Sequence, residues 1–162
     1  MGTIDLDHSD PDFVRELMEQ PGGDMISACF TCRTCVASCP ISAVNGAFNP
    51  TRIIRMAIYG LKEAILQSDF IWLCSSCYAC QERCPQGVSI TDFMTLLKNM
   101  AIREGHAPSG IRAQLTLVKG EGRIYPIDDF DNKKRSKAGL PELPTACADI
   151  SRLFHGINEI NG

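Results

Sequence analysis

Two stretches of the chain, CFTCRTCVASCP at residues 29–40 and CSSCYACQERCP at residues 74–85, decide its fold and its chemistry. Both place four cysteines at the spacing C-x2-C-x2-C-x3-C and follow the fourth cysteine with a proline. Every cysteine of the first stretch recurs 45 positions later. A repeat at a fixed offset indicates that one structural unit is duplicated, with its copies related by a pseudo-two-fold axis.

The spacing of these cysteines favours iron–sulfur clusters over zinc. Zinc sites commonly use C-x2-C pairs separated by a long loop, whereas three cysteines at successive x2 spacings wrap one corner of a 4Fe-4S cubane. In the two-cluster ferredoxin pattern, the fourth cysteine, which precedes the proline, binds the other cluster. The sequence therefore predicts two 4Fe-4S clusters with crossed ligand sets: Cys29, Cys32, Cys35 and Cys84 for the first, and Cys74, Cys77, Cys80 and Cys39 for the second.

Two other interpretations of the cysteines stay open at this point. Two zinc knots would stabilise a small folded core equally well, and clusters can serve as structural staples instead of electron carriers. Cys147 stands outside both motifs and is interpreted as an ordinary buried thiol, so it is left out of the ligand sets. Within the second motif, Tyr78 is expected to shield its cluster, and the neighbouring Trp72 is expected to pack against the core.

The composition is that of a soluble globular protein. The chain has 162 residues, of which 44% are hydrophobic and 22% are charged. A formal net charge of -3 gives no electrostatic reason to expect nucleic acid. The first 25 residues lack the features of a secretory signal, and residues 53–66 fall short of the ~20 apolar residues that span a bilayer. We expect a cytoplasmic protein with reduced thiols and no direct membrane span.

A short helix is predicted before the first motif. Ser9 or Asp10 can cap it, and Pro11 suits its first turn. The glycines and proline of residues 21–23 end it. Its apolar face comprises Phe13, Val14, Leu17 and Met18.

Two further helices are predicted, one between the motifs and one after them. Asn49 and Pro50 open the first, whose apolar stripe comprises Ile54, Ala57, Ile58, Leu61, Ala64 and Ile65. Ser89 is placed to cap the second and Gly105 to end it, with Phe93, Leu97, Met100 and Ala101 facing inward. Because residues 1–105 show no period-2 alternation, we expect an all-α core.

The chain after Gly105 has a different character. Residues 109–118 are compatible with a short amphipathic helix, but residues 120–144 mix glycine, proline and charge without periodicity. A weak final helix is expected from about residue 146 to residue 154, with Thr145 as its cap. We therefore divide the chain into an N-terminal helix and linker (1–24), an α-helical domain with both clusters (25–106) and an extended, mostly irregular C-terminal arm that docks on a partner (107–162).

Motifs for small-molecule chemistry are absent from the sequence. No G-x-G-x-x-G follows a predicted strand, and neither a P-loop nor a Cys-Cys pair occurs. We therefore expect no nucleotide, flavin or substrate pocket and no catalytic residue. Electrons would have to enter and leave through other proteins.

Three segments closely resemble the C subunit of heterodisulfide reductase: residues 49–55 (NPTRIIR), 71–85 (IWLCSSCYACQERCP) and 97–105 (LKNMAIREG). The resemblance covers about residues 25–108 and implies an α-helical ferredoxin domain. In that family the clusters relay electrons from the flavin-bearing A subunit to the B subunit, which is the double-cysteine protein where the disulfide is reduced. It implies that the eight motif cysteines are ligands and that this chain is a non-catalytic relay in an oxidoreductase complex. Arg33 and Gln86 depart from the family pattern, which commonly has glycine and a basic residue there.

Two rival functions remain. The iron–sulfur subunits of fumarate reductase and of anaerobic glycerol-3-phosphate dehydrogenase are similar, but they would bring an N-terminal 2Fe-2S domain or C-terminal double-cysteine domains, and neither is visible in this sequence. A different class is a regulatory binding module whose metal sites sense metal or oxygen. Reversible reduction at low potential would argue against that module.

Overall fold

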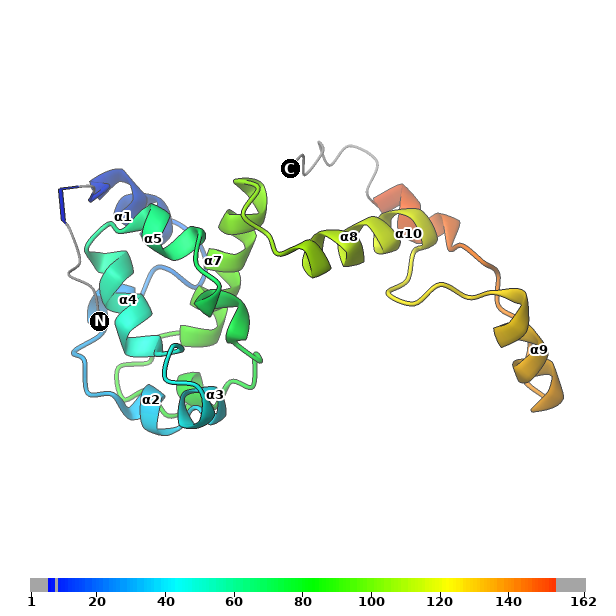
Figure 1. Cartoon of the computed structure of the whole chain (residues 1–162). Helices are drawn as coiled ribbons and strands as arrows, with labels where there is room; N and C mark the ends of the chain where they lie inside the picture. The colour runs from blue at the N-terminus through cyan, green and yellow to red at the C-terminus, as the bar shows by residue number, and fades with distance from the viewer. Residues whose placement is uncertain (1–5, 8, 154–162) are drawn as a thin grey trace. The chain divides into compact units, whose positions relative to one another are not determined.

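The structure is a computed structural model of the chain, and it describes residues 6–7 and 9–153. The described residues form helices and turns without a β-strand, which confirms the predicted all-α class (Figure 1). The chain divides into two compact units between His106 and Ala107. The N-terminal unit contains helices α1 (Pro11–Met18), α2 (Thr34–Ala37), α3 (Pro40–Val44), α4 (Pro50–Ile58), α5 (Lys62–Leu66), α6 (Ala79–Glu82) and α7 (Ile90–Arg103), with the 3-10 turns η1 (Ile26–Ala28) and η2 (Phe70–Leu73).

The two cysteine motifs are embedded in matching sets of elements. In each copy a 3-10 turn leads into the motif, a helix of 4 residues follows the second cysteine, and a longer helix comes after the motif. The longer helix α4 packs against η1 and α2, and α7 packs against η2 and α6. The short helices α2 and α6 contact each other. This arrangement matches the duplication that the cysteine spacing predicts.

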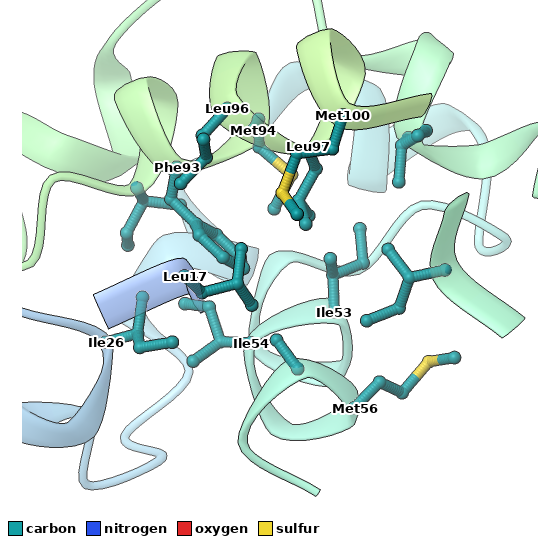
Figure 2. Close-up of a cluster of buried hydrophobic side chains, with 14 of the residues drawn as sticks. Leu17, Ile26, Ile53, Ile54, Met56, Phe93, Met94, Leu96, Leu97 and Met100 are labelled. Atoms are coloured by element: carbon teal, nitrogen blue, oxygen red, sulfur yellow. The ribbon is translucent and has the colours of Figure 1, made fainter. Parts of the chain in front are cut away.

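The core of the N-terminal unit lies between the two longer helices. Figure 2 shows side chains of α7 facing those of α4, with residues of α1 and η1 beside them. The fully buried side chains include Leu17, Ile26, Ile53, Ile54, Phe93, Met94 and Leu97. Each such side chain contributes roughly 1.5–3 kcal/mol relative to an exposed one. The short helices α2 and α3 lie at one end of the unit, away from α1 and α5 (Figure 1).

Helix α1 belongs to this core. Asp10 caps it, because its Oδ1 accepts hydrogen bonds from the N–H groups of Asp12 and Phe13 at 2.9 and 3.2 Å. Phe13 and Leu17 are fully buried, whereas Met18 is 39% exposed. The apolar face is therefore narrower than the sequence predicts.

The single helix predicted between the motifs is in fact two helices. Helix α4 ends at Ile58 and α5 begins at Lys62, because Gly60 between them adopts a φ of +69°. The N–H groups of Gly60 and Leu61 bond to the carbonyl oxygens of Ala57 and Met56 at 2.9 and 3.0 Å. These two bonds make a Schellman motif, which reverses the chain at the end of a helix. The predicted stripe stays largely buried across the break, at Ile54, Ala57, Leu61 and Ile65.

The start of α7 differs from the prediction. Ser89 occupies the cap position, but its side chain makes no capping hydrogen bond. Gln81 of α6 takes that role instead: its Oε1 accepts from the N–H of Thr91 at 3.1 Å, and its Nε2 donates to Asp92 at 3.1 Å. The second motif is thereby fixed to the N-terminus of α7. The predicted stop at Gly105 is confirmed.

The C-terminal unit is more helical than the sequence predicts. Its helices are α8 (Ser109–Glu121), α9 (Asp129–Lys137) and α10 (Ala148–Leu153), and α8 packs against α10. Residues 122–128 and 138–147 are irregular, as expected. The predicted final helix starts a little later than expected, and residue 154, its predicted end, lies outside the described residues.

Helix α9 is not predicted, because it lies in a stretch of sequence that is expected to be irregular. It carries no apolar stripe, so a search for periodicity cannot find it. Its ends stabilise it instead: Asp128 and Asp131 form a capping box, with acidic residues in the first turn and basic residues in the last. No helix in the described part of the chain is long and apolar enough to cross a membrane.

The close approach at Gly60 yields a test of how α1 is held. An added Cβ at Gly60 would lie 2.5 Å from the carbonyl oxygen of Asp10, whose N–H already donates to the Gly60 carbonyl at 2.8 Å. Gly60→Ala combines this clash with an unfavourable positive φ and should cost about 2 kcal/mol or more of unfolding free energy. Urea unfolding of the cluster-loaded protein, followed by circular dichroism, measures the loss.

Gly105→Ala is the matched control. Gly105 has a φ of +79° at the end of α7, but nothing lies within 4 Å of its added Cβ. Only the cost of the backbone conformation, about 1 kcal/mol, should then appear. Equal losses in the two variants would show that the contact with Asp10 contributes nothing.

Candidate metal centre

Two cavities of the N-terminal unit are lined by cysteines from both motifs. Each has about 320 Å³ of atom-free space, which includes its opening to solvent. The cysteines lining one cavity are Cys29, Cys32, Cys35 and Cys84. Those lining the other are Cys39, Cys74, Cys77 and Cys80. Each cavity therefore combines three cysteines of one motif with the fourth cysteine of the other.

The two cavities share one lining residue. Ile90, the first residue of α7, lines both of them and is only 2% exposed. The N-terminal ends of the longer helices border the cavities too, through Pro50 and Thr51 of α4 and Thr91 of α7. Helix N-termini carry a partial positive charge, which favours the negative charge of a thiolate-ligated cluster.

The backbone turns sharply at matching positions of both motifs. Thr31 and Arg33 have φ values of +67° and +66°, and Ser76 and Tyr78, 45 positions later, have +52° and +62°. Successive N–H groups in such turns form concave nests that bind anions. A positive φ costs a non-glycine residue roughly 1–2 kcal/mol, so these turns carry some backbone strain. Arg33 and Tyr78 line the first and second cavity, respectively.

A buried threonine hydroxyl accompanies the third cysteine of each motif. Thr51 Oγ1 lies 3.2 Å from Cys35 Sγ, and Thr91 Oγ1 lies 3.6 Å from Cys80 Sγ. Burial raises the pKa of the Cys35 and Cys80 thiols, and the threonine hydroxyls oppose this rise in pKa. Binding to iron requires the thiolate form, so these hydroxyls favour the state that a cluster needs.

The remaining sulfur contacts are less uniform. The fourth cysteines accept backbone hydrogen bonds at 3.4 Å, Cys39 from the N–H of Ser42 and Cys84 from that of Val88. Cys32 Sγ lies 3.3 Å from the hydroxyl of Thr34, and this hydrogen bond lowers the pKa of the exposed Cys32 thiol. Alanine stands at the position equivalent to Thr34 in the second motif.

A lysine of α7 brings a positive charge to the second motif. Lys98 Nζ donates a hydrogen bond of 2.9 Å to the carbonyl oxygen of Cys74, and the contact is partly buried. Arg83, in contrast, reaches only the hydroxyl of Ser38 at 3.5 Å and stays exposed. Trp72 packs against the core, as predicted. Nothing in its helical spacing separates Lys98 from a solvated lysine, so its place beside the motif is not predictable from the sequence.

The two threonines beside the third cysteines are not among the predicted site residues either. Thr51 and Thr91 are each the second residue of the helix that follows a motif. They lie 40 positions apart and the cysteines 45, so a search at the cysteine offset does not pair them. The two threonines can be matched instead by their position as the second residue of the helix that follows each motif.

Cys147 lies in the C-terminal unit, where its backbone N–H donates to Glu121 at 2.9 Å. It lines neither cysteine cavity. Across the described ranges, no three His, Cys, Asp or Glu side chains are grouped closely enough to hold a lone metal ion.

Comparisons with known proteins identify the domain around the two cavities. Residues 25–88 match the family model of the 4Fe-4S dicluster domain. The C subunit of the H(2):CoB-CoM heterodisulfide,ferredoxin reductase of Methanothermobacter thermautotrophicus is 38% identical over 159 residues, which cover 98% of this chain and 82% of the relative. The chain belongs to the family of heterodisulfide reductase C subunits.

Other relatives agree with this assignment. The C 2 iron-sulfur subunit of the CoB--CoM heterodisulfide reductase of Methanocaldococcus jannaschii is 36% identical over 90% of this chain and 82% of its own length. The C subunit of the Ferredoxin:CoB-CoM heterodisulfide reductase of Methanosarcina mazei is 39% identical over 80% of this chain and 78% of its own length.

Family membership answers two of the questions left open by the sequence. Like its relatives, the chain is an iron–sulfur component of an oxidoreductase. The dicluster domain, together with eight cysteines in two motifs, accounts for two 4Fe-4S clusters, and the zinc interpretation is set aside.

The charge of Lys98 should affect the reduction potential of the cluster near Cys74. A nearby cation stabilises a reduced cluster, which is the more negative state, and so raises the reduction potential. Lys98→Met should therefore lower the reduction potential of the cluster held by the second motif, which contains Cys74, and leave the potential of the other cluster unchanged. Lys98→Arg should keep most of the wild-type potential. A dye-mediated redox titration followed by electron paramagnetic resonance measures both. Unchanged potentials in a fully loaded Lys98→Met protein would contradict this role.

Proposed function

We propose that this C subunit relays electrons within a heterodisulfide reductase-type complex. Its two 4Fe-4S clusters would supply one-electron carriers between a flavin-bearing protein of the A-subunit type and a double-cysteine protein of the B-subunit type that reduces the disulfide. The chain itself would bind the clusters, shield them and dock the partners, and no residue of it would be catalytic. The complex would work in the cytoplasm, where thiols stay reduced.

The observation that carries this proposal is the composition of the two cysteine cavities. We assign Cys29, Cys32, Cys35 and Cys84 to the first cluster, and Cys74, Cys77, Cys80 and Cys39 to the second. The assignment is supported by the cavities, since each is lined by one of these sets. Thiolates are the ligands that iron–sulfur clusters use, and the motif spacing suits the cubane form.

The closeness of the cavities favours a relay over two independent structural staples. A single buried side chain, Ile90, lines both. Exchange of the fourth cysteines also ties the two halves together, so neither cluster could bind without both motifs in place. A pair of carriers at such close range suits transfer between two partners on different sides.

The C-terminal arm, residues 107–162, is proposed to dock the chain on its catalytic partner. Its described part exposes large apolar side chains on α9 and on the irregular segments: Ile124 (69%), Tyr125 (62%), Phe130 (62%) and Leu140 (51%). Large apolar side chains that are exposed in the free chain become buried when a partner covers them. The exposure of these side chains supports a docking role for the arm.

The crossed ligand sets are tested by Cys39→Ala. Cys39 belongs to the first motif, but on our assignment its loss leaves the second cluster with three ligands. Magnetic resonance of the reduced protein should then show a damaged second cluster, seen as a 3Fe signal or lost iron, beside an intact first cluster. Cys84→Ala should give the reciprocal result and Cys147→Ala no change. Damage confined to the first cluster in Cys39→Ala would refute the crossing.

Anaerobic co-purification tests the relay and the docking arm. The full-length chain should bring down a flavoprotein and a double-cysteine protein. Ile124→Asp in the arm should reduce their recovery several-fold, because it places a charge on an apolar contact surface. Leu6→Asp, an exposed apolar position of the N-terminal unit at 54% exposure, is the matched control. A chain ending at His106 that still recovers both partners would remove the docking role of the arm.

A further inference from the structure

Two buried threonines occupy equivalent places in the two halves of the cluster domain. Thr51 is the second residue of α4 and Thr91 the second residue of α7. Their exposures are 6% and 1%, and they are the polar residues that are buried in the described part of the chain. A polar side chain is costly to bury unless it forms a hydrogen bond, so each hydroxyl needs a partner.

That partner is a cysteine sulfur in both halves. Thr51 Oγ1 approaches Cys35 Sγ at 3.2 Å, and Thr91 Oγ1 approaches Cys80 Sγ at 3.6 Å. A thiolate has no proton, so the threonine hydroxyl is the donor once the cysteine ligates iron. The duplicated chain has kept this contact in both copies, although the connection from motif to helix differs in length by five residues.

The other donors near the buried and half-buried motif sulfurs are backbone groups, and the backbone N–H of Val36 also acts on Cys35. The backbone N–H groups of Ser42 and Val88 point to the fourth cysteines, and Lys98 reaches a carbonyl oxygen instead of a sulfur. The hydroxyls of Thr51 and Thr91 are thus side-chain partners of the sulfurs of a buried and a half-buried cysteine, and donate to them when these are thiolates. A hydrogen bond in such a poorly hydrated place acts more strongly than one exposed to water.

We propose that Thr51 and Thr91 set the reduction potentials of the two clusters through these hydrogen bonds to Cys35 and Cys80. This inference rests on the ligand sets proposed above. Reduction adds one electron, taken from a low-potential donor, to a cluster whose sulfurs then carry more negative charge. A hydroxyl donor stabilises that extra charge more than it stabilises the oxidised state, and so raises the potential. Neither threonine is a ligand, so both act as positioning residues on the thiolates.

The test uses full-length variants, loaded with clusters and titrated with redox dyes under magnetic resonance detection. Thr51→Val keeps the shape of the side chain and removes the hydroxyl. At a fixed solution potential it should reduce the ratio of reduced to oxidised first cluster by about tenfold, which is ~59 mV for one electron. Thr91→Val should do the same to the second cluster only, by a smaller factor because its contact is longer. Thr51→Ser and Thr91→Ser should restore most of each potential.

Thr34→Val is the matched control. Thr34 Oγ1 lies at a similar distance of 3.3 Å from Cys32 Sγ, but this contact is exposed to water. Its removal should change the potential of the first cluster less than Thr51→Val does. A shift as large as that of Thr51→Val would overturn the role of burial, and unchanged potentials in fully loaded Thr51→Val and Thr91→Val would overturn the proposal.

Iron analysis and Thr51→Ala and Thr91→Ala guard against a failure of assembly. If neither the valine nor the alanine variants load clusters while the serine variants do, the hydroxyls act in assembly and the proposal is wrong. The relay is tested separately by the co-purifying partners. Shifted potentials in a chain that recovers no flavoprotein would support the role of the threonines and contradict the relay. Unchanged potentials in a chain that recovers both partners would support the relay and contradict the role of the threonines.

Discussion

Cysteine sulfurs from segments 45 residues apart line the same cavity, and the rest of the N-terminal unit follows from that constraint. The fourth cysteine of each motif can reach the other cavity only if the two motifs lie against each other, which the contact between α2 and α6 provides. The longer helices α4 and α7 pack against the short helices of the motifs, and their N-terminal ends border the cavities. Their apolar faces meet in the core shown in Figure 2. The shared cysteine cavities at one end of the unit and the hydrophobic core at the other thus require the same pairing of the two duplicated halves.

The sequence predicts those parts of this arrangement that depend on local chemistry. The cap at Asn49, the stop at Gly105 and the buried positions of α7 follow from residue type and spacing, and all are found. The predictions fail where tertiary contacts decide. The apolar stripe continues across Gly60, where the positive φ ends α4 and the backbone packs closely against Asp10. The cap of α7 is likewise supplied by Gln81, from another helix.

In the candidate site, too, the features set by local sequence are predictable and those set by tertiary contacts are not. The two groups of cysteines that line the cavities correspond to the sets derived from spacing, because the motif itself encodes which sulfurs lie together. The groups that surround the sulfurs are not encoded in the motif. Thr51 and Thr91 are the second residues of helices that start at different distances from the motifs, and Lys98 contacts Cys74 across 24 residues. Helix α9 marks another limit, since its stability comes from charged ends without an apolar stripe.

Duplication alone would give the two cavities equal surroundings. The two halves differ in a few charged and polar groups. Beside the first cavity are Arg33 and the exposed hydroxyl of Thr34, whereas the second has Tyr78 and a contact from Lys98 to the Cys74 backbone. These substitutions leave the shared cysteine and threonine contacts intact while changing the local charge. A duplicated fold can thus keep its shape and still give its two cysteine sites different surroundings, on which the reduction potential of a cluster depends.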